Sequence, residues 1–269
     1  MVDFESENKY CLYDLKKLIE LLCSPDGCPW DRAQTHMSIR RNMLEEAYEA
    51  AEAIDTGDMD HLCEELGDVL MQVVFHSEMA KKAGHFDLDD VADVTCRKLI
   101  RRHPHVFGEF KAKDGDQSLV FWDRVKREEK SQDTVAETLD GVARSLPALW
   151  RAEEIQKKAA AAGFDWPDIS GALDALREEL GELEEAAKSG VGVEEELGDL
   201  IFSAVNVARF LGVDPEKAAG ASCDKFISRF RYLEDAAKAE GRVLEDMTLD
   251  EMDKLYNQAK TYFSFEKEK

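Results

Sequence analysis

Residues 178–211 read EELGELEEAAKSGVGVEEELGDLIFSAVNVARFL, with two acidic motifs on either side of a short linker that contains two glycines. Residues three or four apart share a helix face, so Glu179 and Glu182 point the same way. Glu196 and Asp199 form a second such pair. The sequence after Asp199 is apolar nearly all round, which predicts a buried helix. The stretch therefore predicts two helices, each presenting a pair of carboxylates.

The same motifs occur in the same order in the first half of the chain, as EEAYE at 45–49 and EELGD at 64–68. The two acidic motifs lie 16 residues apart in this copy and 14 residues apart in the other. A basic KxxxR element follows in both copies. Its charged residues are Lys98 and Arg102 in the first copy and Lys225 and Arg229 in the second. Three motifs repeated in order indicate an internal duplication.

The duplication predicts two domains, residues 1–130 and 131–269, each a helical bundle, and an all-α fold. We expect helices at 8–23, 38–56, 59–84, 87–103 and 118–130, with a loop at 104–117. In the second half we expect Pro147 at a first helical position, Ser170 as the N-cap of a helix ending at 189–190, helices at 194–212 and from 214 onward, and a last helix with a Thr248–Glu251 capping box. The alternative explanation of the repeat is the duplication of a helical scaffold whose acidic face is merely solvated.

Composition narrows the class of protein. The 269 residues carry a net charge of −23, which repels nucleic-acid polymers but permits a small anion that arrives with a divalent cation. No apolar run is long enough to cross a membrane, and residues 1–10 lack an apolar signal core. Six scattered cysteines do not suggest a disulfide framework. We expect a soluble, cytoplasmic protein that binds neither membrane nor nucleic-acid polymer.

The paired carboxylates are candidate metal ligands. Carboxylates at the head of a buried helix are unstable unless they are paired, protonated or bound to a cation. Oxygen-rich sites suit Mg²⁺, with Mn²⁺ as the alternative. A di-iron bundle would need Glu-x-x-His pairs, and none of the six histidines has a glutamate three residues before it. The predicted ligands are Glu179, Glu182, Glu196 and Asp199, with a secondary site at Glu46, Glu49, Glu65 and Asp68.

Lys225, Arg229 and Asn206 are candidate substrate contacts. Lys225 and Arg229 lie one helical turn apart and could neutralise a triphosphate. Ordinary surface charge is the alternative for both. Asn206 lies seven residues after Asp199 on the same face, where nucleotide, metal-bound water or a core polar network could satisfy it. Phe75 stands at the matching place in the first copy, so the two sites are not chemically equal.

These motifs resemble those of the all-α nucleoside triphosphate pyrophosphatases, and the two-copy arrangement is similar to the MazG family. Further stretches carry the resemblance across nearly the whole chain: Cys28-Pro29-Trp30-Asp31 with Gln34-Thr35-His36, Arg102-His103-Pro104-His105-Val106-Phe107, Ser145-Leu146-Pro147-Ala148-Leu149, Gly163-Phe164-Asp165-Trp166 and Val205-Asn206-Val207-Ala208-Arg209. The resemblance implies Mg²⁺-dependent hydrolysis of nucleoside triphosphates to monophosphate and diphosphate. It also implies broad base tolerance, a homodimer and activity in the C-terminal copy.

When the family's functional residues are carried over by position, the metal ligands are those given above, and Lys225 and Arg229 are phosphate contacts. Tyr256 matches an aromatic near the base, with a core aromatic as the alternative. Lys98, Arg102 and Trp30 are the secondary candidates in the first copy. Two departures remove cations: Gly190–Val193 stands where a basic residue is expected, and no lysine lies near Ala175.

Three carboxylates, Glu178, Glu179 and Glu195, are candidates for the base that activates water. The alternative function is a non-catalytic helical regulator that senses nucleotide or Mg²⁺. Other phosphohydrolase classes lack support, because the chain has no His-Asp dipeptide, no P-loop motif and no strand-rich frame for a Nudix fold.

Overall fold

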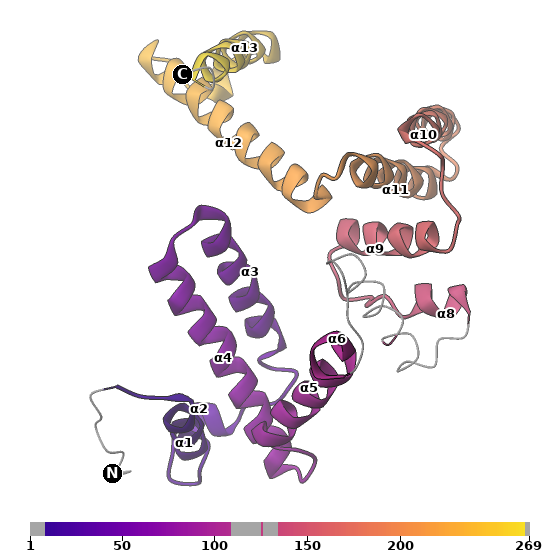
Figure 1. Ribbon diagram of the computed structural model, residues 1–269. Helices are drawn as coiled ribbons and strands as arrows, with labels where there is room; N and C mark the ends of the chain where they lie inside the picture. The colour runs from indigo at the N-terminus through magenta and orange to yellow at the C-terminus, as the bar shows by residue number, and fades with distance from the viewer. Residues whose placement is uncertain (1–8, 109–124, 126–133, 267–269) are drawn as a thin grey trace. The chain divides into compact units, whose positions relative to one another are not determined.

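The computed structural model describes residues 9–108, 125 and 134–266, and it divides the chain into two compact units, Met1–Lys126 and Arg127–Lys269. Every regular element in the described residues is helical (Figure 1), which confirms the predicted all-α class. None of the described helices combines the length and apolar character needed to span a bilayer. The two units are described separately below.

The first unit is built around a two-helix hairpin, α3 and α4. Gly57 ends α3 in the left-handed region (φ 72°), and Asp58 caps α4 by accepting hydrogen bonds from two backbone N–H groups. The reversal takes only two residues, so the helices pack side by side in opposite directions (Figure 1). The helices of this unit are α1 Leu12–Leu22, α2 Pro29–Arg32, α3 Arg40–Thr56, α4 Met59–Lys82, α5 Leu88–Arg102 and α6 Pro104–Phe107.

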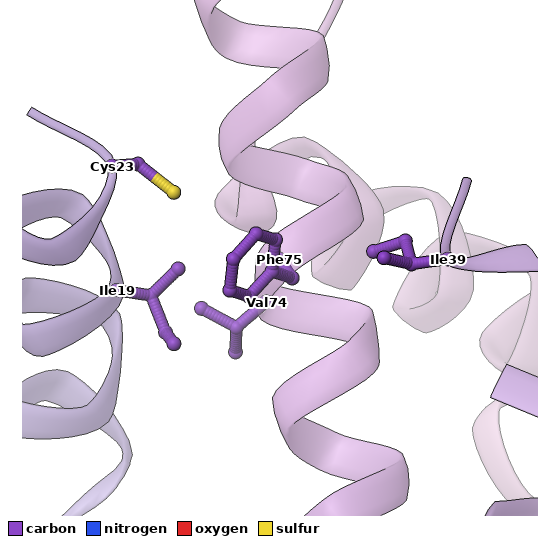
Figure 2. Packing of buried hydrophobic residues seen from close by; sticks show 5 residues of the cluster. All are labelled: Ile19, Cys23, Ile39, Val74 and Phe75. Carbon is purple, nitrogen blue, oxygen red and sulfur yellow. The ribbon is translucent and has the colours of Figure 1, made fainter. Parts of the chain in front are cut away.

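The core of the first unit lies where α1 packs against α4. Figure 2 shows Ile19 and Cys23 facing Val74 and Phe75, with Ile39 approaching from the segment before α3. Val74 is 1% exposed and Phe75 is 7% exposed. Burial of these side chains fixes the rotation of α4 about its own axis.

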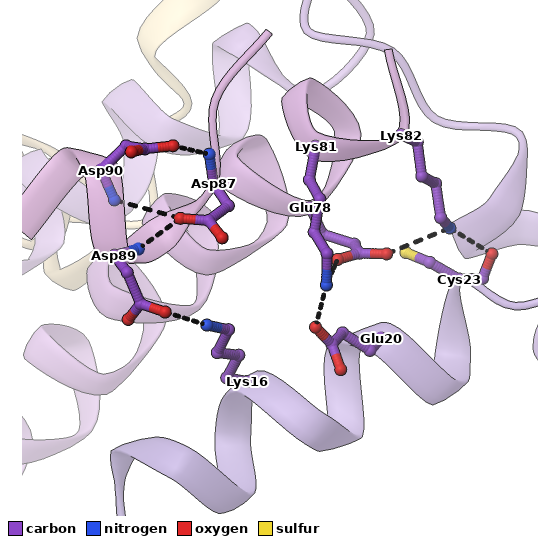
Figure 3. Close-up of polar contacts among 9 residues, drawn as sticks. All are labelled: Lys16, Glu20, Cys23, Glu78, Lys81, Lys82, Asp87, Asp89 and Asp90. Atoms are coloured by element: carbon purple, nitrogen blue, oxygen red, sulfur yellow. Dashed lines mark hydrogen bonds and ion pairs between the residues drawn. The ribbon is translucent and has the colours of Figure 1, made fainter. Parts of the chain in front are cut away.

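A polar layer joins α1, α4 and the start of α5 beside this core (Figure 3). Lys16 forms an ion pair with Asp89 at 2.8 Å, and Lys81 pairs with Glu20. Asp87 caps α5 through a reciprocal capping box with Asp90. These contacts tie three helices together at positions where the apolar core ends.

The second unit repeats the hairpin with α10 and α11, and α9 packs against α11. A separate core forms where α12 packs on α13, around Leu233, Ala237, Met247 and Leu255. Trp150 on α9 donates to Asp214, the N-cap of α12, at 2.9 Å. The helices of this unit are α8 Val135–Asp140, α9 Ala148–Ala161, α10 Ile169–Ser189, α11 Val193–Leu211, α12 Pro215–Ala239, the 3₁₀ turn η1 Leu244–Asp246 and α13 Leu249–Glu266.

Most predicted helices of the first half are confirmed within a few residues, with two differences. The first helix begins at Leu12, with Cys11 as its N-cap, rather than at residue 8. The predicted loop at 104–117 is wrong at its start, because Pro104–Phe107 forms α6 with proline at the first position. The helix predicted at 118–130 lies outside the described residues, apart from residue 125, which is helical.

In the second half, two predicted helix starts are displaced and one capping box is confirmed. Pro147 is the N-cap of α9 rather than its first residue. Asp168, not Ser170, caps α10, because its carboxylate accepts the Ser170 N–H at 2.8 Å. The Thr248 and Glu251 side chains exchange hydrogen bonds with each other's backbone N–H groups, so that capping box is confirmed.

The prediction that α11 is buried is wrong for much of its length. Val205 and Asn206 are its buried residues, whereas Leu197 and Ile201 are each 46% exposed. Within the described residues, α9 and α10 cover α11 on one side, and the start of α12 reaches its end. No other described helix of this unit packs extensively on the remaining apolar face.

Candidate active site

Three of the four predicted ligands in the second unit come together at the α10–α11 hairpin. Carboxylate oxygens of Glu179, Glu196 and Asp199 lie within 4.8 Å of one another. Gly190 and Gly192, both with positive φ, reverse the chain between the helices and bring their acidic faces together. Convergence of oxygens from two helices is the arrangement that the motif spacing predicted.

Like charges crowd this cluster. Burial raises the pKa of Glu179, and the neighbouring carboxylates of Glu182, Asp199 and Glu196 raise it further. Burial likewise raises the pKa of Glu196, followed by Glu182 and Glu195. Glu182 therefore lies near the cluster without belonging to the set of three. No ion pair is described for the set of three, and a bound divalent cation would relieve the repulsion.

The remaining acidic candidates lie at the edge of the cluster. Glu178 and Glu195 are exposed on α10 and α11, and each adjoins a clustered glutamate in the sequence. An open pocket beside the first turn of α11 is lined by Gly190, Gly192, Val193, Glu194 and Glu195. Of the candidate carboxylates, Glu195 is the one that lines this pocket.

The first unit contains a matching cluster at the α3–α4 hairpin. Carboxylate oxygens of Glu46, Glu49 and Glu65 lie within 4.8 Å of one another. Burial raises the pKa of Glu46, and the charge of Asp68 raises it further, so Asp68 lies close by. The fourth predicted ligand of this copy is thus near the cluster but outside the set of three.

Glu65 shows that this first cluster has an unfilled bonding position. The residue is 8% exposed, and its Oε1 lies 3.0 Å from His61 Nε2. Its other oxygen, Oε2, is buried without a hydrogen-bond partner among the described residues. Gln72 is also buried, with Nε2 3.5 Å from Glu46 Oε1 and its own Oε1 unpartnered. A cation fits this donor set, because buried carboxylate oxygens without partners are otherwise unfavourable.

Arg229 and Tyr256 lie together on the α12–α13 pair. The Arg229 guanidinium carbon is 5.9 Å from the Tyr256 ring centre, and the Phe226 ring is 5.8 Å from it. Arg229 Nε is buried without a partner among the described residues, and Lys225 is exposed. No described hydrogen bond or ion pair connects Lys225 or Arg229 to the acidic cluster.

The secondary candidates of the first unit lie on different elements. Lys98 and Arg102 are half-buried one turn apart on α5, as their spacing predicted. Trp30 lies on α2 and is 63% exposed. No described contact joins these three residues to the cluster around Glu65.

Asn206 belongs to a polar chain that sequence reasoning did not assign. Its Oδ1 accepts a hydrogen bond from Arg209 Nε at 2.9 Å. Arg209 also donates to both carboxylate oxygens of Asp165, at 2.6 and 3.0 Å, and this contact lowers the pKa of Asp165. Asp165 and Arg209 belong to two of the motifs that carry the family resemblance, and this was the signal in the sequence that could have pointed to their contact. Sequence reasoning likewise missed His61 and Gln72.

Fold and site together define a class: a duplicated helical protein in which each copy brings together, at a two-helix hairpin, three carboxylates that could hold a metal ion. The sequence model of the MazG nucleotide pyrophosphohydrolase domain matches residues 34–107 and 169–233. Those two segments contain both hairpins and both KxxxR elements. The chain belongs to the MazG nucleotide pyrophosphohydrolase family.

Two relatives match this chain over nearly their whole length, and a third matches it over half of its length. The nucleoside triphosphate pyrophosphohydrolase/pyrophosphatase MazG of Thermotoga maritima is 43% identical over 92% of this chain and 94% of its own length. The nucleoside triphosphate pyrophosphohydrolase of Escherichia coli K12 is 41% identical over 91% and 95%, respectively. The uncharacterized protein YabN of Bacillus subtilis is 45% identical over 91% of this chain and 50% of its own length. The predicted family and the predicted class, a hydrolase of nucleoside triphosphate anhydride bonds, are confirmed.

Proposed function

We propose that the second unit hydrolyses nucleoside triphosphates to monophosphate and diphosphate at the α10–α11 hairpin. The observation that carries the proposal is the convergence of Glu179, Glu196 and Asp199 within 4.8 Å, in a chain of the MazG family. Glu182 is the fourth proposed ligand. We propose Mg²⁺ as the cation, with Mn²⁺ as the alternative, because the donor set consists of oxygens. Nucleoside triphosphates are metabolites of the cytoplasm, where we place the activity.

The residues of the site divide the chemistry among them. A bound Mg²⁺ would supply Lewis-acid polarisation of the phosphate oxygens. One of Glu178, Glu179 and Glu195 accepts the proton of the water that attacks the α-phosphorus. Lys225 and Arg229 offset the charge that develops on the departing diphosphate. This division needs acidic and basic groups to meet in one site.

We propose that the nucleobase stacks on the Tyr256 ring. The Arg229 guanidinium and the Phe226 ring already contact it, at 5.9 and 5.8 Å between centres, as a cation–π pair and an aromatic pair. Stacking on an aromatic face accepts any base, because every base has a π face. Broad base tolerance follows from this mode of binding.

The exposed apolar face of α10 and α11 supports a homodimer. Leu180 is 49% exposed, and Leu197 and Ile201 are each 46% exposed, next to the acidic cluster. Such a contiguous apolar face is unfavourable in water and is typical of an interface. A second copy would cover it. Replacing Leu197 with glutamate should lower the mass measured by light scattering to that of the monomer, whereas the same change at exposed Leu249 should not.

We propose that residues 1–130 and 131–269 are two domains of unequal activity. The first holds a secondary cation and nucleotide site at Glu46, Glu49, Glu65 and Asp68, with Lys98, Arg102 and Trp30 as substrate contacts. Phe75 occupies the place of Asn206, so this site lacks an amide that the second has. If residues 1–130 hydrolyse substrate as well as residues 140–269 do, the proposed asymmetry fails.

The deciding experiment incubates the full chain with a panel of nucleoside triphosphates and Mg²⁺ and identifies the products. Monophosphate with diphosphate supports the proposal, whereas nucleoside diphosphate with phosphate contradicts it. Binding without turnover supports the alternative, a non-catalytic regulator that senses nucleotide or Mg²⁺. Removal of Mg²⁺ with EDTA should stop the reaction.

Matched variants locate the activity within the chain. Glu179→Gln and Asp199→Asn should each abolish diphosphate release while the protein stays folded, because each removes a ligand charge. Glu184→Gln is the control, since Glu184 is an exposed glutamate on the same helix outside the cluster. Full activity in Glu179→Gln would show that the cluster is not the site.

A further inference from the structure

The Asp165–Arg209–Asn206 chain fixes the orientation of an amide. A guanidinium group only donates hydrogen bonds, so the Asn206 atom that lies 2.9 Å from Arg209 Nε must be the carbonyl oxygen. This contact settles which side of the amide is oxygen, a choice that geometry alone often leaves open. The amide nitrogen Nδ2 therefore points away from Arg209.

Arg209 itself is held firmly. Its two terminal nitrogens donate to both oxygens of Asp165, 44 residues away in the chain, in the loop before α10. The Arg209 side chain is 13% exposed, and Asp165 lies at the surface with its side chain 27% exposed, so this forked ion pair is only partly shielded from water. All three nitrogens of the guanidinium are engaged, which leaves it no freedom to rotate.

The nitrogen of Asn206 is left for a ligand. Asn206 is 8% exposed, and its Nδ2 makes no hydrogen bond with any described residue. Some described side-chain atoms are both buried from solvent and without a hydrogen-bond partner, and Nδ2 is not one of them. Solvent can therefore still reach this nitrogen. An oriented donor that solvent can still reach, in a mostly buried side chain, points to an acceptor outside the chain.

The place of Asn206 identifies the part of the substrate it can meet. It follows Asp199 by two helical turns on the same face of α11, about 10 Å along the axis. A cation held at Asp199 has ligands at about 2.1 Å, so Asn206 lies outside its coordination shell. For a substrate that extends along α11 from this cation, the oxygens near Asn206 are those of the sugar or base rather than those of the metal-bound phosphates.

We propose that Asp165 and Arg209 are positioning residues that hold Asn206 as a hydrogen-bond donor to the nucleoside part of the substrate. This inference rests on the proposed function, because it takes the substrate to be bound at the Asp199 end of α11. It gives a joint role to the Gly163–Trp166 and Val205–Arg209 motifs.

The test measures binding of the α,β-methylene analogue of adenosine triphosphate, and separately of inorganic tripolyphosphate, to the full chain with Mg²⁺. Asp165→Asn frees Arg209 and should weaken binding of the analogue about tenfold, the value of one hydrogen bond, while binding of tripolyphosphate is not weakened. Asp174→Asn is the control, because it removes the same charge from an exposed pair with Arg177 in the same unit.

The sign of the change separates orientation from charge. Removing a negative charge should by itself tighten binding of a polyanion, so weaker binding cannot come from electrostatics alone. The proposal is overturned if Asp165→Asn binds the analogue as Asp174→Asn does, or if it loses affinity for tripolyphosphate equally. Circular dichroism checks the fold of each variant.

A second variant keeps the charge. Arg209→Lys retains a cation for Asp165 but lacks the fork that reaches Asn206 at the same time. It should show the same loss of affinity for the analogue, and unchanged affinity would overturn the proposal even if Asp165→Asn fails to fold. If the wild-type chain releases no diphosphate but binds the analogue, the proposed function fails while this inference is still tested.

Discussion

Replacing Phe75 with asparagine should unfold the first unit rather than give it the amide found in the second. Phe75 is 7% exposed and packs with Ile19, Ile39 and Val74 in the core between α1 and α4 (Figure 2). Loss of a buried phenylalanine side chain costs about 3–5 kcal/mol, and an unpartnered buried amide costs about 1–3 kcal/mol more. The sum, about 4–8 kcal/mol, is comparable to the whole stability of many domains.

Amide hydrogen exchange followed by mass spectrometry reports this loss within the full chain. A destabilisation of about 4 kcal/mol speeds exchange about a thousandfold for amides that open by global unfolding of the unit. Peptides from α1 and α4 should therefore lose nearly all protection in Phe75→Asn. Phe75→Leu is the matched control and should cost about 1 kcal/mol, because it keeps an apolar side chain of similar volume.

Equal protection in the asparagine and leucine variants would refute this reasoning. It would mean that the site tolerates a polar group and that packing does not explain the difference between the two copies. The expected result instead makes Phe75 a core residue, whose position in the second unit is taken by the hydrogen-bonded Asn206.

Three further predictions concern stability. Burial, followed by the proximity of His36, lowers the pKa of His76 below 6.5, so the unfolded chain binds the proton more readily than the folded chain does. The free energy of unfolding contributed by His76 should therefore be present above pH 6.5 and fall below it. Urea unfolding should give a lower stability at pH 5.5 than at pH 7.5, and His76→Gln should remove this difference. The Thr248 N–H and then Arg242 lower the pKa of Glu251 from 4.5 to about 2. Glu251→Ala should therefore lower Tm at pH 6, and the difference in Tm from the wild-type chain should vanish as the pH falls from 4.5 to 2. A difference in Tm that stays constant over this range would contradict the prediction. A Cβ at Gly27 would overlap the carbonyl oxygens of Leu21 and Leu22, so Gly27→Ala should lower the free energy of unfolding in urea by about 1–3 kcal/mol. Gly220 lies in open space within α12, so Gly220→Ala should raise that free energy by about 0.5–1 kcal/mol. Equal effects of the two changes would refute the steric argument.

Local sequence signals predicted the hairpins closely, because capping is a short-range interaction. Asp58 and Gly57 act within a few residues of their own backbone, and so do Asp214 and Thr248. The errors in helix starts were also local. The sequence predicts Ser170 as the N-cap of α10, whereas Asp168, two residues earlier, caps it; both residue types are good N-caps, and only the backbone geometry distinguishes them.

The acidic cluster was predictable for a different reason. Spacing of three residues places two carboxylates on one helix face, and the duplication in the sequence repeats the arrangement. Which three oxygens converge was not predictable, because it depends on the separation and rotation of the packed helices. Glu182 and Asp68 consequently lie next to their clusters rather than within the sets of three.

By itself, the sequence determined that the chain is helical, that it is duplicated, and that each copy carries paired carboxylates followed by a basic element. These properties follow from periodicity and spacing within single helices. The tertiary structure alone decided that Arg209 reaches Asp165 across 44 residues, that Glu65 keeps a buried oxygen unpartnered, and that Leu197 and Ile201 stay exposed. Such contacts depend on how the hairpin turns and packing angles place whole helices, which no local pattern of residues encodes.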